Sequence, residues 1–360
     1  MDPAKLVTPH HSPDGQPVAP AAPGVDLNTL RLPELYAALA KTGLVRRLLE
    51  IARDEDLGSE ESPWHGRARL SPGQSWGGDI TTASCVDPAR VGHAQLVMRV
   101  GGVVAGLEVM GDLLDVFAPG CTFEPSAVDG TRVSPGAVLG VLKGPLDEIL
   151  ELERTLLNLL SRLCGVATNT AVFHSAMLGG EGNASKVRAK LYDTRKTTPG
   201  LRVLEKYAVR CGGGHCHRMG LYDALLIKDN HIAGMGVVKA PELPGLVLKA
   251  VEKARELAQS GGHYPPAFVE VEVDDLEQLR ALLTLPRGVV DIVLLDNMGV
   301  EKLREAAALR DRMMPGLQLE ASGGVSLTTI HSIAQTGVER ISVGALTHGA
   351  VGVDIGLDIE

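Results

Sequence analysis

The spacing of apolar residues divides the chain into regions with different expected structures. Leucines recur at helical intervals over residues 27–53, and a polar segment rich in glycine, serine and proline follows at 54–78. Between 79 and 144, short runs of valine, leucine and isoleucine alternate with turn dipeptides such as Pro119-Gly120, a pattern typical of antiparallel strands. Residues 146–163 carry a wide apolar helical face, which predicts a helix that links two domains.

From residue 187 onward, strand-like and helix-like patterns alternate. Strands are predicted at 187–192, 224–227, 267–273, 289–295, 317–319 and 340–343. Helices are predicted between them at 201–209, 247–257, 276–283, 300–310 and 327–336. This alternation predicts a parallel sheet with outer helices. Because polar residues follow every strand, we favour closure into an α/β barrel with its active site at the carboxyl ends of the strands.

Composition narrows the class of protein. Hydrophobic residues make up 44% and charged residues 22% of the chain, as in ordinary soluble proteins. An aromatic content of 3% and a net charge of -9 argue against a nucleic-acid partner. No apolar run is long enough to cross a membrane. Five cysteines without a CxxC pair, and a Pro-rich leader at 1–24 that lacks a secretory pattern, predict a cytoplasmic protein whose leader is disordered.

One basic stretch stands out in this acidic chain. Residues 191–232 hold ten basic side chains: Arg195, Lys196, Arg202, Lys206, Arg210, His215, His217, Arg218, Lys228 and His231. A concentrated cluster predicts a site for a small polyanion that is held by charge-assisted hydrogen bonds. Two of these residues, Lys206 and Arg210, could equally form the solvated face of a helix.

Two further groups of residues follow the later strands. Ser322-Gly323-Gly324 and Gly344-Ala345 suit phosphate binding by backbone N–H groups, although they could be ordinary turns. Glu272 and Asp296 could hold Mg²⁺ together with substrate phosphates, stabilise a developing positive charge, or simply pair with lysines.

Several familiar sites are disfavoured. The spacing of Cys211, His215, Cys216 and His217 does not match a zinc site, and an anion-binding loop after three glycines explains His217 and Arg218 better. The chain has no Rossmann GxGxxG fingerprint, Walker A loop or GxSxG elbow, which weakens dehydrogenase, P-loop and α/β-hydrolase interpretations.

Taken together, a set of motifs resembles one known family. The motifs are GDITT (78–82), ERTLLNLLS (153–161), DTRKTTPGLR (193–202), EKYAVRCGGGHCHRMGLYDALLIKDNHI (205–232), VEVEVDDLEQL (269–279), VLLDN (293–297), LEASGGV (319–325) and ISVGALTH (341–348). In this order they resemble quinolinate phosphoribosyltransferase, the nicotinate-nucleotide pyrophosphorylase family. The leader and the segment at 54–78 depart from the compact family pattern.

The resemblance implies an α/β sandwich domain and an incomplete α/β barrel. The expected divisions are a leader at 1–24, the sandwich at 25–165 with its insertion at 54–78, the barrel at 166–346, and a segment at 347–360 that packs back on the sandwich. The family joins quinolinate to phosphoribosyl pyrophosphate (PRPP) with Mg²⁺ and yields nicotinate mononucleotide, pyrophosphate and CO₂, a step of NAD biosynthesis. It also implies a homodimer or an assembly of dimers.

The resemblance also implies roles for individual residues. Those that match quinolinate-binding positions are Arg195, His217, Arg218 and, donated across a dimer interface, Arg154. Those that match catalytic positions are Glu272, Asp296, Lys196 and Lys228, with Glu272 and Asp296 at the metal. Those that match phosphate-binding positions are Lys196, Lys228, Ser322, Gly323, Gly324, Gly344 and His348.

Three alternatives stay open at this point. One is a sister phosphoribosyltransferase that acts on nicotinate or another aromatic acid. The second is a barrel that binds phosphates or sugar nucleotides without catalysis. The third is an aldolase-type barrel in which Lys228 forms a Schiff base.

Overall fold

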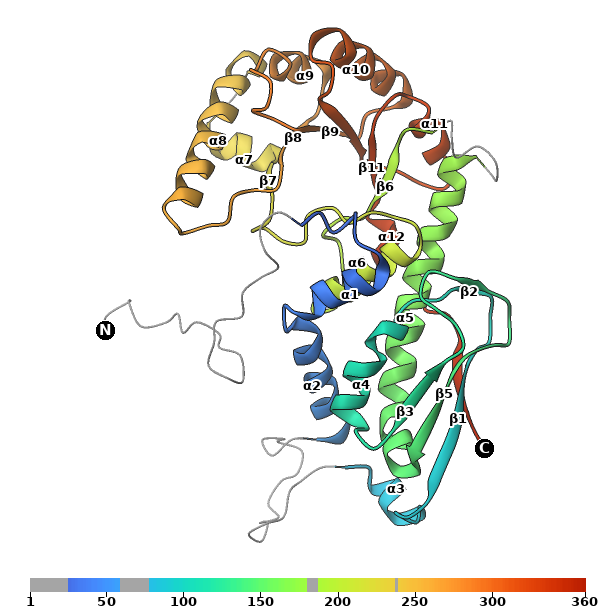
Figure 1. Cartoon of the computed structure of the whole chain (residues 1–360). Coiled ribbons are helices and arrows are strands. Elements are labelled where there is room, and N and C mark those ends of the chain that lie inside the picture. Colours follow the sequence, from blue (N-terminus) through green and yellow to red (C-terminus); the bar gives the residue numbers. More distant parts are fainter. Residues whose placement is uncertain (1–24, 59–77, 180–186, 237–238) are drawn as a thin grey trace, which may run out of the picture. The chain divides into compact units, whose positions relative to one another are not determined.

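The computed structural model describes residues 25–58, 78–179, 187–236 and 239–360 (Figure 1). The predicted leader at 1–24 and most of the predicted insertion at 54–78 lie outside these residues. The chain divides after Cys164 into two compact units, and Gly352–Glu360 belongs to the first of them.

The first unit is built on an antiparallel sheet with the strand order β12-β1-β5-β3. These strands are β1 (Val91–Met98), β3 (Thr122–Pro125), β5 (Ala137–Pro145) and β12 (Ile355–Ile359). Two short strands, β2 (Gly102–Val103) and β4 (Arg132–Val133), form a separate two-stranded sheet. The helices are α1 (Leu32–Ala40), α2 (Leu44–Leu57), α3 (Ile80–Cys85) and α4 (Met110–Phe117), with a 3-10 turn at Leu107–Val109.

The antiparallel strands predicted for residues 79–144 are confirmed, but this region also contains helices α3 and α4. Helix α4 buries Met110, Leu113, Val116 and Phe117. These residues are three, three and one positions apart, so they form one helical face. The prediction of strands alone for this region was wrong, because the apolar composition of residues 110–117 suits a strand whereas their spacing suits a helix.

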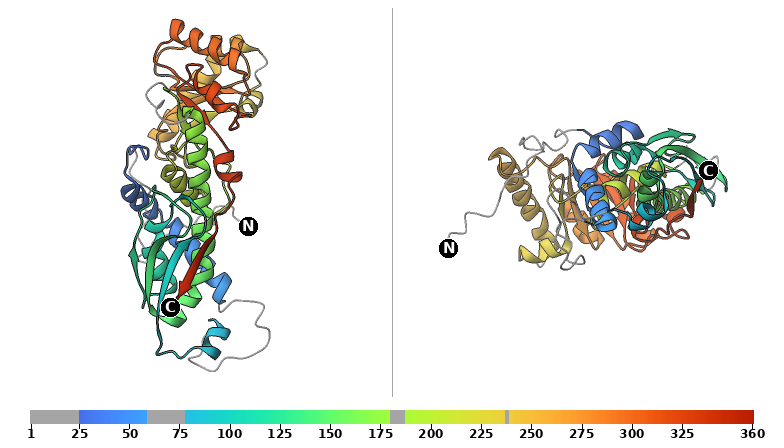
Figure 2. Two further views of the ribbon diagram at one scale, coloured as in Figure 1. Left: turned by 90° about the vertical axis from the view of Figure 1, so that its right-hand side faces the viewer. Right: turned by 90° about the horizontal axis from the view of Figure 1, so that it is seen from below.

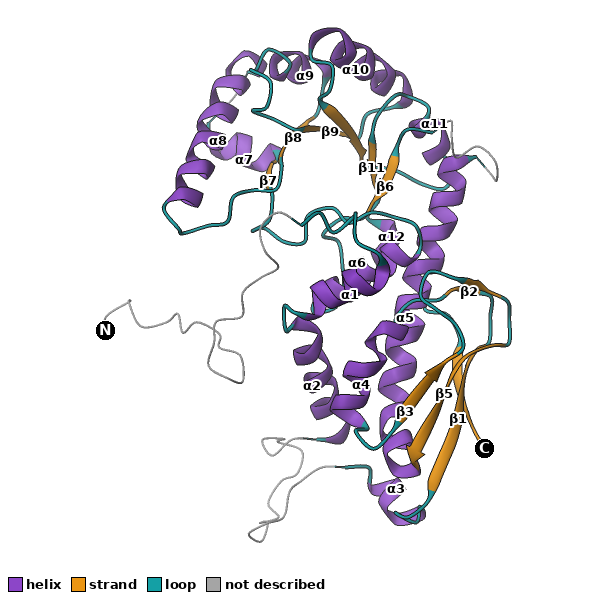
Figure 3. Cartoon of the chain, in the orientation of Figure 1, coloured by secondary structure: helices purple, strands orange, loops and turns teal. Residues whose placement is uncertain are grey.

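The second unit is built on a parallel sheet with the order β6-β11-β10-β9-β8-β7 (Figure 3). The strands are β6 (Lys190–Tyr192), β7 (Leu225–Ile227), β8 (Val269–Val273), β9 (Ile292–Asp296), β10 (Gln318–Ser322) and β11 (Arg340–Ser342). All six predicted strands are present. Because β6 and β7 are the two edges and do not pair, the barrel is incomplete, as the family resemblance implied.

Helices follow the strands of the second unit. They are α6 (Arg202–Cys211), α7 (Asp229–Gly234), α8 (Leu243–Gln259), α9 (Leu276–Leu282), α10 (Val300–Met313), α11 (Ile330–Ala334) and α12 (Ala345–His348), with a 3-10 turn at Ala240–Glu242. Figure 1 shows α8 to α11 around the outside of the curved sheet.

Helix α5 (Leu146–Leu178) passes from the first unit into the second (Figure 2). At 33 residues it is much longer than the predicted helix at 146–163. Among the described residues it is the one helix long and apolar enough to cross a membrane, but 61% of its most apolar stretch is buried inside the protein. Burial of this kind is a property of core helices.

Strand β8 shows how the sequence directs charge into the barrel. Its sequence is VEVEV, and all five residues are buried. Since side chains alternate along a strand, the three valines share one face and Glu270 and Glu272 share the other. Glu270 contacts His217, so the carboxylate face is the inner face of the curved sheet.

Helix α10 is fixed to the amino ends of the strands by a buried arginine. The side chain of Arg310 is 2% exposed and its Nη1 donates to Glu339 Oε2 at 2.7 Å and to the Leu317 carbonyl at 2.6 Å. The same Glu339 oxygen accepts the Leu319 backbone N–H at 2.9 Å. The pair therefore joins α10 to the starts of β10 and β11.

We predict that Glu339→Ala lowers the free energy of unfolding by about 2 kcal/mol or more, because the buried Arg310 then keeps only its pair with the exposed Asp311 and the Leu319 backbone N–H loses its acceptor. Urea denaturation of the purified protein measures this. The matched control is Glu301→Ala on α10, the helix that carries Arg310. The exposed pair of Glu301 with Arg304 should contribute less than about 0.5 kcal/mol. Equal effects of the two substitutions would contradict the prediction.

Candidate active site

Polar groups gather at the carboxyl ends of the six parallel strands, where active sites of such sheets lie. Strand β6 leads into Asp193, Arg195 and Lys196, and β7 into Lys228. The neighbouring strands end in carboxylates and glycines: Glu272 on β8, Asp296 on β9, Ser322-Gly323-Gly324 after β10 and Gly344 after β11.

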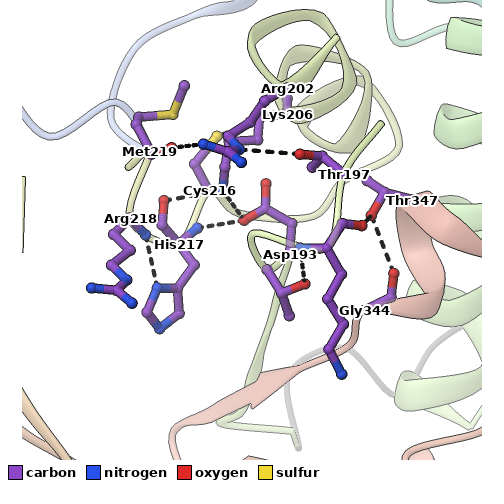
Figure 4. A network of polar contacts seen from close by, with 12 residues as sticks. Asp193, Thr197, Arg202, Lys206, Cys216, His217, Arg218, Met219, Gly344 and Thr347 are labelled. Atoms are coloured by element: carbon purple, nitrogen blue, oxygen red, sulfur yellow. Dashed lines mark hydrogen bonds and ion pairs between the residues drawn. The ribbon is translucent and has the colours of Figure 1, made fainter. Parts of the chain in front are cut away.

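A fully buried ion pair holds the basic stretch together (Figure 4). Lys206 Nζ on α6 lies 2.5 Å from Asp193 Oδ1, and both side chains are 0% exposed. The same carboxylate oxygen accepts the backbone N–H of His217 at 2.8 Å, and Lys206 Nζ also donates to the His217 carbonyl at 3.4 Å. Lys206 is therefore not on a solvated helix face; it fixes the loop that carries His217 and Arg218.

The neighbouring Glu205 performs a similar task for the loop before α6. It is fully buried and accepts hydrogen bonds from the backbone N–H of Thr198 at 3.1 Å and from its hydroxyl at 2.7 Å. Arg210, the other residue whose role the sequence left open, donates from Nη1 to the Gly214 carbonyl at 3.2 Å. The helix is thus buried on nearly all sides and stabilises the loops at both of its ends.

Arg195 and Arg218 form a pair of like charges. Burial and the positive charge of Arg195 lower the pKa of Arg218. Nε of Arg195 is buried and has no hydrogen-bond partner among the described residues. Arg218 is 7% exposed, and its Nη1 donates to the Ala224 carbonyl at 3.5 Å. Two arginines that repel each other in a partly dry site form a receptor for an anion.

Lys228 and Glu272 form an ion pair across the ends of β7 and β8. Glu272 is 7% exposed, whereas the Lys228 side chain is 41% exposed and can reach a ligand. A protonated lysine paired with a carboxylate is not the neutral amine that Schiff-base formation needs. This pair therefore weakens the aldolase alternative.

Several carboxylates lie close together near Asp296. Burial and the negative charges of Asp229, Asp296 and Asp275 raise the pKa of Asp274. The Asp296 carboxylate itself accepts a hydrogen bond of 2.7 Å from the Asn297 side chain. The excess of carboxylate oxygens at the ends of β8 and β9 fits a hard divalent cation such as Mg²⁺.

The glycines leave open backbone at the ends of β10 and β11. Gly323 has a φ of +83°, and an added Cβ would lie 2.2 Å from Asn297 Oδ1, so only glycine fits here. At Gly344, a Cβ would lie 2.9 Å from Lys196 Cδ and 3.3 Å from the His348 ring. The structure thus brings Lys196, Gly344 and His348 together, and the Thr347 hydroxyl donates to the Lys196 carbonyl at 2.8 Å.

Beneath these groups lies a buried layer of charge in which His217 is the one residue to which the resemblance gave a role. His217 Nε2 lies 3.0 Å from Glu270 Oε2 and 3.4 Å from Glu320 Oε1, and both carboxylates are 0% exposed. Arg340 Nε donates to Glu320 Oε2 at 2.6 Å. The available signal was the alternation in β8 and β10, which places Glu270 and Glu320 on inward positions between apolar residues.

The hydrogen bonds decide where this layer holds its protons. The Arg218 backbone N–H donates to His217 Nδ1 at 2.8 Å, so Nδ1 carries a lone pair and the ring proton is on Nε2. Burial lowers the pKa of His217, but Glu320 and Glu270 raise it to about 10. The hydrogen bond that Nδ1 accepts leaves no place for a second ring proton, so we assign a neutral imidazole and place the proton on a neighbouring carboxylate. Burial and the Glu320 charge raise the pKa of Glu270, and we assign the remaining proton to Glu270.

Glu320 behaves in the opposite way. Burial alone would raise its pKa, but His217 and Arg340 lower it below the ordinary value of 4.5. His217, Glu270 and Glu320 have ligand atoms within 4.8 Å of one another, as a metal site would. The Arg340 guanidinium already neutralises Glu320, however, so the layer is balanced without a metal ion.

Arg154 lies on α5 in the first unit and is exposed. It is therefore free of the core and accessible to a second molecule.

We predict that Glu270→Gln changes the free energy of unfolding by less than about 1 kcal/mol, because glutamine has the shape and hydrogen-bonding capacity of a protonated glutamate. Glu320→Gln should cost about 3 kcal/mol, because it leaves the buried Arg340 unpaired. Urea denaturation at pH 7 compares them. Equal losses would place the proton elsewhere.

The pH dependence provides a second check. Because the folded-state pKa of Glu320 is lowered, its contribution to stability is complete above the unfolded pKa and decreases as the pH falls. The stability difference between the unmodified protein and Glu320→Gln should therefore shrink below pH 4.5.

Known proteins resemble most of the chain. Residues 79–164 match the family model described as quinolinate phosphoribosyl transferase, N-terminal domain, and residues 166–358 match that of the C-terminal domain. The chain is 41% identical over 296 residues to a nicotinate-nucleotide pyrophosphorylase [carboxylating] of Mycobacterium leprae, which covers 81% of this chain and 95% of that protein. A probable nicotinate-nucleotide pyrophosphorylase [carboxylating] of Bacillus subtilis is 36% identical over 282 residues, or 78% of this chain and 88% of that protein.

Solved structures of similar proteins have the same fold. The nicotinate-nucleotide pyrophosphorylase of Francisella tularensis superimposes with a TM-score of 0.69 at 30% identity and covers 93% of this chain and 99% of its own. With both domain models matched in order and the strand ends arranged as described, the chain belongs to the quinolinate phosphoribosyltransferase family.

Proposed function

We propose that the protein transfers the phosphoribosyl group of PRPP to quinolinate and releases nicotinate mononucleotide, pyrophosphate and CO₂. The observation that carries this proposal is the pair Arg195 and Arg218, two cations in one partly buried site, where Arg195 lowers the pKa of Arg218 and Arg195 Nε has no hydrogen-bond partner among the described residues. A pyridine with two carboxylates supplies the two negative charges that such a pair requires.

Quinolinate would be positioned chiefly by these arginines. Both ring nitrogens of His217 face protein groups, so we assign His217 the task of orienting Arg218 through its backbone. Arg154 would come from a second copy of the chain, which makes a homodimer part of the proposal. Holding the pyridine nitrogen next to C1 of the ribose is the main contribution to rate that the binding residues provide.

Glu272 and Asp296 would act on the ribose. As pyrophosphate leaves, C1 becomes cationic, and carboxylates fixed at the ends of β8 and β9 stabilise that charge. Mg²⁺ would be held by Asp296 and Glu272 together with the substrate phosphates, and when bound it would neutralise negative charge on the leaving pyrophosphate. Glu272 is paired with Lys228, so the lysine holds this carboxylate in place.

Release of CO₂ follows from the charge on the ring. Once the nitrogen is bonded to ribose it is positive and stabilises the electron pair that stays on the adjacent ring carbon when the C2 carboxylate leaves as CO₂. That carbon then takes up a proton from water to give nicotinate mononucleotide. No covalent nucleophile takes part in this scheme.

The phosphates would be bound by groups at the ends of β6, β10 and β11, namely Ser322, Gly323, Gly324, Gly344, Lys196 and His348. We also propose that the protein is located in the cytoplasm.

One assay tests the reaction. Purified protein with Mg²⁺ and PRPP receives quinolinate labelled at the C2 carboxylate, and nicotinate is added in a parallel reaction. We expect labelled CO₂ and nicotinate mononucleotide from quinolinate alone. Product from nicotinate alone would move the protein to the sister activity, and product from neither would refute the proposal. Omission of Mg²⁺ with added chelator should abolish turnover.

A binding experiment tests the division of the site. We expect Arg218→Ala to weaken quinolinate binding by roughly 30-fold or more, as loss of a charge-assisted bidentate contact does, and to change PRPP binding by less than about threefold. Calorimetry with each ligand measures this, and exposed Arg255→Ala on α8 is the matched control. Equal weakening of both ligands would mean that the two halves of the site are assigned wrongly.

A further inference from the structure

A cavity of about 480 Å³ lies at the opposite ends of the strands from the candidate active site. Its lining includes Phe268 just before β8, Val290 and Asp291 before β9, Leu317 and Gln318 at the start of β10, and Arg340 at the start of β11. All of these are amino ends of strands, whereas Glu272, Asp296 and Gly344 lie at or after carboxyl ends. The cavity is therefore a second site within the same unit.

Arg340 gives this cavity a buried cation with unused hydrogen-bonding capacity. The residue is 8% exposed. Its Nε donates to Glu320, and its guanidinium carbon lies 3.6 Å from the centroid of the Tyr192 ring. Among the described residues, no acceptor bonds its two terminal nitrogens. An arginine presents five N–H donors in a fixed plane, so most of them remain available to a ligand in the cavity.

The other lining residues define what kind of anion fits. Phe268, Val290, Ile292 and Leu317 provide apolar walls, and the Phe268 ring lies 5.7 Å from the Arg340 guanidinium carbon. At the rim, the exposed side chains of Arg287 and Asp291 have opposite charges. The group that would bind a carboxylate is Arg340, which is paired with Glu320 through Nε alone, and the walls favour an apolar body.

We propose that this cavity binds a small aromatic monocarboxylate, whose carboxylate accepts hydrogen bonds from the terminal nitrogens of Arg340 and whose ring packs against Phe268 and Leu317. Cavities of this volume hold small ligands, and a carboxylate on an arginine fork is a strong, directional contact. Phe268 also contacts the His217 ring edge-on, at 5.5 Å between centroids. The ligand would thus lie directly under the charged layer that supports the candidate active site.

The test uses benzoate as the probe and benzamide as its uncharged counterpart of the same shape. Because benzoate could also bind Arg195 and Arg218, the reference protein is the full chain with Arg218→Ala, and binding is followed by ligand-observed NMR titration. We expect saturable benzoate binding with a dissociation constant on the order of 1 mM for so small a ligand. Benzamide should bind about tenfold more weakly or worse.

Two further substitutions in the reference protein locate the probe. Arg340→Met removes the cation and should weaken benzoate binding about tenfold or more. Gln318→Trp fills the cavity at an exposed position outside the charged layer, and it should have the same effect even if Arg340→Met fails to fold. Circular dichroism establishes that each protein tested is folded.

Three results would overturn the proposal. They are no saturable binding of benzoate to the reference protein, equal binding of benzamide, or benzoate binding that persists unchanged in the folded Gln318→Trp protein. The last result would place the probe elsewhere, at the remaining arginine of the candidate active site. Reduced binding in Gln318→Trp together with selectivity for the carboxylate would establish the cavity as the site.

Discussion

The ion pair between Lys206 and Asp193 is the interaction on which the candidate active site depends. Both side chains are completely buried, and a buried charge without its partner is strongly unfavourable. The pair therefore fixes where α6 lies relative to the end of β6. Because the same two groups bind the backbone of His217, the position of Arg218 follows from theirs. A site for a rigid dianion requires fixed cations, and this pair fixes one of them.

The order of strands in the sheet places the chemical groups differently from their order in the sequence. Strands β11 and β10 lie between β6 and β9. The glycines that would bind phosphates are therefore next to Lys196 on one side and next to Asp296 on the other. Contact between Gly344 and Lys196, and between Gly323 and the Asn297 side chain, shows this directly. A pyrophosphate bound at the glycines would lie between cationic and acidic groups, as a transfer between an anionic acid and a cationic ribose requires.

The inner face of the sheet is charged, although it is buried. His217, Glu270, Glu320 and Arg340 satisfy one another through hydrogen bonds and ion pairs, with one proton assigned to Glu270. Such a layer contributes less to stability than an apolar core of the same volume, so its retention is explained by what it positions. It holds the His217 ring, which in turn accepts the Arg218 backbone N–H.

The sequence by itself determined the strands, the parallel α/β class and the residues that follow each strand. These features depend on local alternation and on turn residues, which act over a few positions. It also supported the family through motifs such as DTRKTTPGLR and LEASGGV. Helix α4 was missed because its eight residues are too short a run to separate from neighbouring strands by composition. The length of α5 was underestimated, since a buried helix has no polar face to mark its continuation.

Only the tertiary structure decided which charges are buried and with what partners. Lys206 reads as a surface helix residue in sequence, but α6 is covered on nearly every side and Asp193 lies 13 residues earlier. Likewise, Glu320 and His217 are 103 positions apart (320 minus 217) and meet only because β10 faces the loop before β7. Hydrophobic patterning specifies which face of an element is buried, but the pairing of buried charges depends on contacts between distant segments, which no local pattern encodes.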